Sequence, residues 1–130
     1  MPTPHILALV SDLFFIPNIQ TVARHLGYTI HFVEQPISKD EFDTLLTEQP
    51  PALLIVDTNN HLVPWADWVT DLKTDDATQH IPVLAFGSHK DVDTMKKAKQ
   101  AGADVVVARS KFTAELPDLI QKYINSATNS

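Results

Sequence analysis

Short apolar runs that alternate with amphipathic stretches of helical length restrict the fold of this chain more than any other feature of its sequence. Residues 5–10 and 52–56 are almost continuously apolar, which is typical of strands buried on both faces of a parallel sheet. Three further runs, 28–33, 81–86 and 104–108, are rich in β-branched, aromatic or other apolar residues and predict three more strands. The pattern therefore indicates five successive βα units.

Helices are predicted after each strand from apolar spacing and from local start and stop signals. The sequence from Ser38 to Glu41 matches a capping box at the start of the second helix. Gly27 and Gly102 follow the first and fourth helical stretches, where a residue with positive φ commonly ends a helix. The third helix carries an apolar stripe whose two tryptophans are expected in the core. This stripe consists of Trp65, Trp68, Val69 and Leu72.

All five units fit into one domain of ordinary size, predicted over residues 1–125 with a disordered tail at 126–130. The last helix is predicted over residues 116–124, with Pro117 in its first turn. The rules for crossovers between parallel strands predict a doubly wound α/β sheet of order 2-1-3-4-5. Ligands of such sheets bind beyond the carboxyl ends of the strands, where the strand order reverses.

Charge and composition exclude several functional classes. The chain has 130 residues, a net charge of −6 and no cysteine, which rules out disulfides, thiolate metal sites and cysteine nucleophiles. An acidic chain is poorly suited to neutralising phosphate backbones, so we expect no nucleic-acid partner. The sequence shows neither a signal-peptide pattern nor an apolar run long enough for a membrane span. These features predict a cytoplasmic protein that does not bind membranes.

Two acidic residues follow the two most apolar strands. Asp12 comes shortly after the first strand and Asp57 directly after the third. Because the carboxyl ends of these strands meet at the switch point, both carboxylates are expected in one pocket. Neighbouring carboxylates repel each other unless a cation lies between them, and such oxygen ligands suit Mg²⁺. Arg109, at the end of the fifth strand, is the candidate counter-charge.

Three segments of the chain resemble the receiver domain of bacterial response regulators. These segments are 52–57, 72–83 and 99–104. The resemblance extends over nearly the whole chain and implies a flavodoxin-like, CheY-like fold. It implies that Asp57 accepts a phosphoryl group from a histidine kinase. It also implies a Mg²⁺ site made by Asp12, Asp57 and the backbone carbonyl of Asn59.

The receiver-like pocket departs from the usual family pattern at three positions. Ser11 stands where a second acid usually follows the first strand. Gly87 stands where the family has Ser or Thr after the fourth strand, and Ser88 is the substitute hydroxyl one place later. Arg109 stands in place of a lysine, to which its forked guanidinium is not equivalent. Arg109 therefore either replaces the lysine or blocks the pocket by bridging Asp57.

These departures lead to one preferred function and two alternatives. We expect a stand-alone, receiver-like signalling protein of two-component (phosphorelay) type, which has a degenerate phosphoacceptor pocket, is not an enzyme and acts mainly through protein–protein interaction. The first alternative is a phosphorylation-competent single-domain receiver in which Asp57 is the Mg²⁺-dependent phosphoacceptor. The second is a small-molecule binder on the same fold, although residues 11–15 lack the glycines that cradle phosphates.

Basic residues gather in the last third of the chain and predict an interaction face. Residues 1–89 include 3 basic and 11 acidic residues, whereas residues 90–130 include 7 and 5. A local excess of positive charge favours an acidic protein surface as partner. The candidate contact residues are Lys96, Lys97, Lys99 and Lys111. The resemblance implies a histidine kinase or a downstream effector as partner, and a homodimer through the fourth helix, fifth strand and fifth helix.

Overall fold

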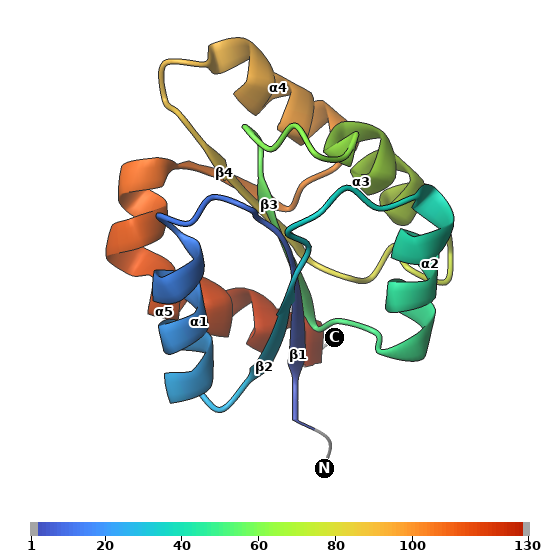
Figure 1. The fold of residues 1–130 in the computed structure, drawn as a ribbon, viewed down its shortest axis with the longest axis horizontal. Helices are drawn as coiled ribbons and strands as arrows, with labels where there is room; N and C mark the ends of the chain where they lie inside the picture. The colour runs from blue at the N-terminus through green and yellow to red at the C-terminus, as the bar shows by residue number, and fades with distance from the viewer. Residues whose placement is uncertain (1–2, 129–130) are drawn as a thin grey trace.

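Five strands and five helices alternate along the chain in the computed structural model, which describes residues 3–128 (Figure 1). The strands are β1 (His5–Leu9), β2 (Thr29–Phe32), β3 (Leu53–Asp57), β4 (Val83–Gly87) and β5 (Val105–Ala108). The helices are α1 (Ile16–His25), α2 (Lys39–Glu48), α3 (Trp65–Thr74), α4 (Val92–Ala101) and α5 (Arg109–Thr128). Each predicted βα unit is therefore present.

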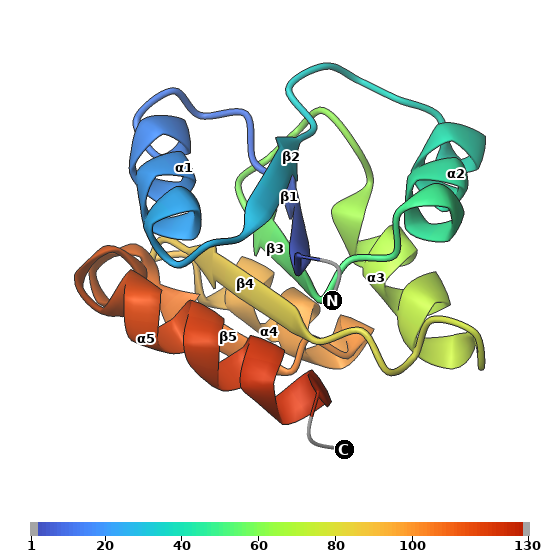
Figure 2. The ribbon, with the colours of Figure 1, turned by 90° about the horizontal axis from the view of Figure 1, so that it is seen from below.

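The strands form one parallel sheet of order β2-β1-β3-β4-β5, which confirms the predicted fold class. Helices α1 and α5 cover one face of the sheet, and α2, α3 and α4 cover the other (Figure 2). In this register Leu9 of β1 pairs with Val56 of β3, and Asp57 pairs with Phe86 of β4. The residues that follow these three strands consequently meet at one end of the sheet, where the carboxyl ends of the strands lie. This end is here called the carboxyl edge of the sheet.

Alternate side chains of the central strands supply two separate hydrophobic clusters, one on each face of the sheet. Ile6 and Ala8 of β1 belong to the cluster under α1 and α5, and Leu7 and Leu9 belong to the opposite one. Each fully buried aliphatic side chain contributes roughly 1.5–3 kcal/mol to stability. A slip of one residue would exchange the two sets, so the register of the strands is strongly fixed.

The helix ends follow the signals in the sequence. The Ser38 hydroxyl accepts the backbone N–H of Glu41 at 3.1 Å and caps α2. Gly27 and Gly102, which follow α1 and α4, have φ angles of 85° and 108°. Such positive φ angles strain residues that have a Cβ, which explains glycine at both positions.

Helix α5 differs from the prediction at both of its ends. It begins at Arg109, directly after β5, instead of near residue 116. Glu115 has non-helical angles (φ −117°, ψ 17°) and marks a kink just before Pro117, because proline disfavours helical geometry in the residues that precede it. The helix then continues to Thr128. The predicted disorder of residues 126–130 stays a prediction. Residues 129–130 lie outside the described part of the chain.

In the part of the chain that the structure describes, none of the helices combines the length and the apolar character needed to cross a membrane.

Candidate functional site

Asp57 ends the central strand β3 at the edge of the sheet where the strand order reverses. Its side chain is buried, with 4% of its surface exposed. Asp57 Oδ1 accepts the backbone N–H of Asn59 at 2.9 Å, and the Asp57 carbonyl accepts the N–H of Asn60 at 3.0 Å. The chain therefore turns tightly after the strand, and this turn holds the Asp57 carboxylate at the carboxyl end of β3.

Burial raises the pKa of Asp57 above its usual value of 3.8. The N–H of Asn59 and the positive charge of Arg109 act in the opposite direction, and the negative charge of Asp12 raises the pKa further. These effects show that Asp12 and Arg109 lie close enough to Asp57 to interact with its charge. The raised pKa also shows that neither Asn59 nor Arg109 compensates fully for the loss of water around the carboxylate.

Asp12 lies in the loop between β1 and α1, and its side chain is exposed. Asp12 Oδ1 accepts the N–H of Phe14 at 2.8 Å, and the Asp12 carbonyl accepts the N–H groups of Phe15 and Ile16. Asp12 therefore organises the turn that leads into α1. The structure brings Asp12 and Asp57 to the same edge of the sheet, but one oxygen of each carboxylate already accepts a backbone N–H.

Arg109 occupies the first turn of α5 and turns toward the loop after β3. Its Nη2 donates to Asn59 Oδ1 at 2.9 Å, and its guanidinium carbon lies 5.8 Å from the centroid of the Phe15 ring. Among the described residues, the ion pairs within 4.0 Å do not include Arg109 with Asp57. A direct bridge from Arg109 to Asp57, one of the two alternatives for this arginine, is thus not formed here, and the Asn59 amide contacts the guanidinium instead.

The side chain of Asn59 is a feature of the candidate site that the sequence did not predict. Asn59 Oδ1 accepts from Arg109 Nη2 and also from the backbone N–H of Ser88 at 3.4 Å. One amide oxygen thus joins the loop after β3 to the starts of the segments after β4 and β5. The resemblance assigns to Asn59 only its backbone carbonyl, and nothing in the sequence indicates a role for its side chain.

Gly87, the last residue of β4, faces the side chain of Thr58. A Cβ built on Gly87 would collide with Thr58 Oγ1, so the hydroxyl of Thr58 fills the space beside this glycine. Thr58 is buried, with 4% exposed, and its hydroxyl has no hydrogen-bond partner within the described residues. The Ser88 hydroxyl, the expected substitute, accepts the N–H of Lys90 at 3.3 Å and so contributes to the turn before α4.

The donor set at this edge is small for a divalent cation. Within residues 3–128 there is no group of three or more His, Cys, Asp or Glu side chains that could hold a metal ion. The carboxylates at this end of the sheet are those of Asp12 and Asp57, and the guanidinium of Arg109 lies near enough to interact with the charge of Asp57. The residues fit a hard cation that takes two carboxylates and completes its shell with carbonyl and water oxygens.

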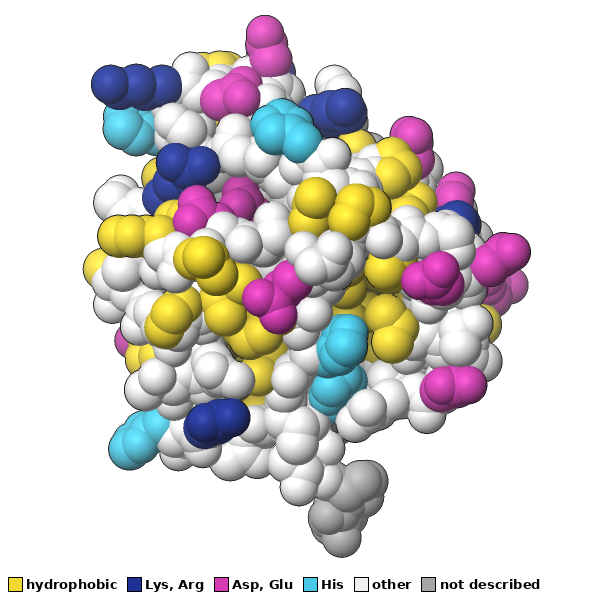
Figure 3. Space-filling model, viewed as in Figure 1, with side chains coloured by type: hydrophobic (Ala, Val, Ile, Leu, Met, Phe, Trp, Pro, Cys, Tyr) yellow, Lys and Arg dark blue, Asp and Glu magenta, His cyan; other side chains and the backbone are white. Residues whose placement is uncertain are grey.

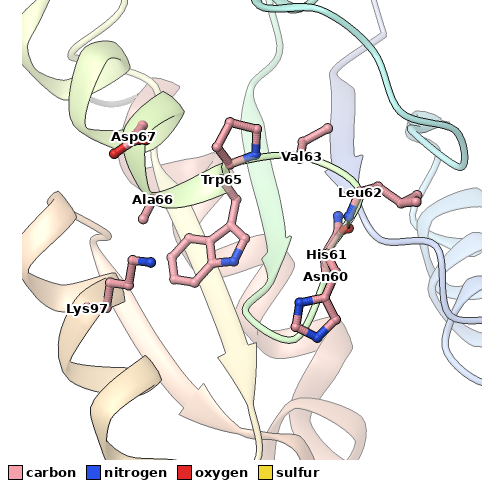
Figure 4. Close-up of a pocket in the computed structure, with 9 residues that line it drawn as sticks. Asn60, His61, Leu62, Val63, Trp65, Ala66, Asp67 and Lys97 are labelled. Atoms are coloured by element: carbon pink, nitrogen blue, oxygen red, sulfur yellow. Dashed lines mark hydrogen bonds between the residues drawn. The ribbon is translucent and has the colours of Figure 1, made fainter.

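A cavity of about 380 Å³ lies next to this edge, between the loop after β3 and helix α4 (Figure 4). Asn60 fixes the loop, because its Nδ2 donates to the Leu9 carbonyl at 3.0 Å and its Oδ1 accepts the N–H of Leu62 at 2.8 Å. Trp65 and Trp68 are both buried, as expected. Trp68 stacks on Phe42 with ring centroids 4.6 Å apart, whereas Trp65 also lines the cavity.

The predicted interaction lysines are exposed but divide between two helices. Lys96, Lys97 and Lys99 lie on α4, and Lys111 lies in the first turn of α5. These helices cover opposite faces of the sheet on either side of β5, which is the edge strand. Figure 3 shows acidic side chains on the side where α2 lies, and basic and acidic side chains together in the upper part of the same face, near α4.

Comparisons with solved structures identify the fold as that of response-regulator receiver domains. A receiver domain of a histidine kinase from Syntrophus aciditrophicus matches with a TM-score of 0.82 at 16% identity, over 98% of this chain and 95% of that one. A receiver domain protein from Clostridium thermocellum matches with 0.75 at 20% identity, over 96% and 97%. The Mn²⁺-bound form of the response regulator Rcp1 matches with 0.74 at 11% identity, over 93% and 94%.

The TM-scores and the coverage of these matches show a shared fold. No protein-family model matches the sequence, and no curated protein gives a significant match. The chain therefore has the CheY-like fold that the resemblance implied, with a sequence that is at most 20% identical to these three solved structures.

Proposed function

We propose that this chain is a receiver-like signalling module of two-component type, with a degenerate phosphoacceptor pocket, that works in the cytoplasm mainly by binding other proteins. Support for the class comes from the CheY-like fold and from an acid at the end of β3. In this proposal the partner is a histidine kinase or a downstream effector, and the chain catalyses no reaction on a separate substrate.

The observation that carries the degenerate pocket is the amide of Asn59. A phosphoryl group on Asp57 would be stabilised by donors aimed at its oxygens, and a guanidinium and a backbone N–H are such donors. In this chain Arg109 Nη2 and the N–H of Ser88 both donate to Asn59 Oδ1. The amide oxygen thus occupies two of the donors that an anion would need, one on the guanidinium and the N–H of Ser88.

The surroundings of Asp57 support the same conclusion. Its carboxylate is buried and has a raised pKa, so its ionised form is disfavoured relative to an exposed carboxylate. Thr58 and Gly87 fill the neighbouring space without offering an exposed hydroxyl. Thr58 and Gly87 therefore provide no exposed hydroxyl that could contact a phosphoryl group on Asp57.

In this proposal a divalent cation binds the pocket only weakly. Asp12 and Asp57 would hold it, with the Asn59 backbone carbonyl as the third protein ligand implied by the resemblance. When bound, the cation would neutralise negative charge between the two carboxylates. Because Arg109 already supplies positive charge near Asp57, we expect Mg²⁺ to bind weakly.

The experiment that tests the proposal is intact-mass measurement after incubation with Mg²⁺ and acetyl phosphate. In a phosphoacceptor, an Asp57 oxygen would bond to phosphorus while the bond from phosphorus to acetate breaks. We expect no added phosphoryl group on the wild type, while a functional receiver domain in the same tube is modified. One added group on the wild type and none on Asp57→Ala would overturn the degenerate pocket and establish a working receiver.

The variant Asn59→Ala tests the amide directly, because it frees Arg109 and the N–H of Ser88. We expect this variant to gain a phosphoryl group that the double variant Asn59→Ala/Asp57→Ala lacks. If Asn59→Ala stays unmodified, the Asn59 side chain is not what disables the pocket.

A further inference from the structure

We propose that the cavity between the loop after β3 and helix α4 is a docking site for an acidic peptide segment of a partner protein that carries an apolar side chain. The inference deepens the proposed function, because it rests on the chain acting through protein contacts and identifies a surface for them. The surface, here called the Trp65 cavity, is lined by residues 60–67 and by Lys97.

Two apolar side chains, Trp65 and Val63, contribute to the floor of the Trp65 cavity. Trp65 has 6% of its surface exposed and Val63 has 5%, so each is largely buried but still lines the cavity. The floor therefore offers a small apolar surface, which suits the end of one apolar side chain.

Cationic and donor groups stand on both sides of this floor. Lys97 reaches from α4 toward the indole, and its Nζ lies 5.8 Å from the centroid of the Trp65 ring. His61 projects from the loop on the opposite side of the indole (Figure 4). Asp67, the single acid of the lining, lies beyond Ala66 on α3. A carboxylate at the rim of the cavity could therefore contact Lys97 or His61 beside the indole.

The charges of α4 favour an acidic partner. Within the described residues, ion pairs closer than 4.0 Å involve only Lys39 and Lys73 among the lysines and arginines. Lys96, Lys97 and Lys99 are thus exposed and free of ion pairs on a chain whose net charge is −6. Unpaired cations beside an apolar floor complement a segment that combines carboxylates with one large apolar residue, and they increase its association rate at low salt.

Two matched variants separate the Trp65 cavity from general charge attraction. Lys97→Met removes a lysine that lines the cavity and contacts the Trp65 ring. Lys122→Met removes an exposed lysine on α5 whose Nζ lies 5.5 Å from the Tyr123 ring. Both variants lose one positive charge and one cation–π contact, but only the first changes the cavity.

The probe is a short, fluorescently labelled peptide of Glu and Ser with one central Leu, measured by anisotropy at low salt. We expect saturable binding to the wild type, about tenfold weaker binding to Lys97→Met and less than about twofold change for Lys122→Met. Replacing the central Leu by Ser should weaken binding to the wild type. The peptide should also change Trp65 fluorescence, whereas Trp68 is shielded by its stacking on Phe42.

Several results would overturn the inference. Absence of saturable binding to the wild type would do so, as would equal loss of affinity in the two lysine variants, which would indicate charge attraction alone. An unchanged affinity after Leu→Ser would show that the cavity is not used. Concentration-dependent self-association that Lys97→Met abolishes would identify a second copy of the chain as the occupant instead. None of these readouts depends on Asp57, so a failed peptide assay leaves the acetyl phosphate test of the pocket intact.

Discussion

Two polar clusters lie at opposite ends of the same sheet, and they differ in how completely their groups are paired. At the amino ends of β4 and β5, Lys73 Nζ lies 2.7 Å from Asp104 Oδ2 and donates to the Ile81 carbonyl at 2.6 Å. Asp104 Oδ2 also accepts the backbone N–H of Val83 at 2.7 Å. This cluster joins the end of α3 to two strands and satisfies each charge that it contains.

The cluster at the carboxyl ends is incompletely paired. Thr58 Oγ1 and Arg109 Nε are buried without partners among the described residues, and Asp57 has a raised pKa. Unsatisfied buried polar groups and shifted pKa values are costly for stability and concentrate at functional sites. The paired cluster at the amino ends of the strands therefore stabilises the fold. The carboxyl ends keep unpaired polar groups whose presence is not explained by stability alone.

Among the variants that test this contrast, Lys73→Met is expected to have the largest effect on stability. The change leaves Asp104 and the Ile81 carbonyl without their cation, in a place where 15% of the lysine side chain is exposed. We expect a loss of about 2–3 kcal/mol in the free energy of unfolding, measured by urea denaturation. The exposed Lys122→Met serves as the control. An equal loss in both variants would show that the Lys73 cluster does not stabilise the fold.

A smaller loss is expected for Gly87→Ala at the opposite end. The new methyl group would collide with Thr58 Oγ1, and crowding of this kind costs about 1–2 kcal/mol. Because this hydroxyl has no partner, Thr58→Ala should be nearly neutral by itself and should restore most of the stability of Gly87→Ala. A double-variant cycle with additive losses would contradict the shared volume.

The Asp57→Asn substitution should change the free energy of unfolding the least, and it should increase this free energy instead of lowering it. Because the folded pKa is raised, the folded state binds the proton more tightly than the unfolded state. The contribution of Asp57 to stability is then fully present below the usual pKa of 3.8 and is lost as the pH rises through the folded pKa. Asp57→Asn should remove this loss, so it should be slightly more stable than the wild type at neutral pH.

Urea denaturation as a function of pH checks the Asp57 prediction. The stability of the wild type should fall more steeply than that of Asp57→Asn as the pH rises above 3.8. Parallel curves would show that Asp57 titrates equally in both states, and the buried carboxylate would then resemble the fully paired cluster at the other end.

The fold was predictable because its signals are local. The two apolar runs predicted buried parallel strands, and Ser38, Gly27 and Gly102 marked helix ends that the structure confirms. The start of α5 was not predictable in the same way. Residues 109–115 have no strong apolar stripe apart from Phe112, which packs in the core, and Pro117 suggested a later start.

The candidate site was predictable only in part, since its details depend on contacts between distant segments. The placement of Asp12 and Asp57 at one edge follows from the strand order. The contact of Asn59 with Arg109 joins residues 50 positions apart in the chain, and asparagine in a loop carries no signal for such a partner. The role of Thr58 depends on Gly87, 29 positions away, and it becomes visible only when β3 and β4 are paired.

The packing of Thr58 against Gly87 has a consequence for the evolution of this sequence. The two positions share one volume, so a substitution at either one changes which residues the other tolerates. A descendant that acquires a hydroxyl-bearing side chain at position 87 must first lose bulk at position 58. The order of these two changes is therefore constrained, and homologous sequences should show the two positions varying together.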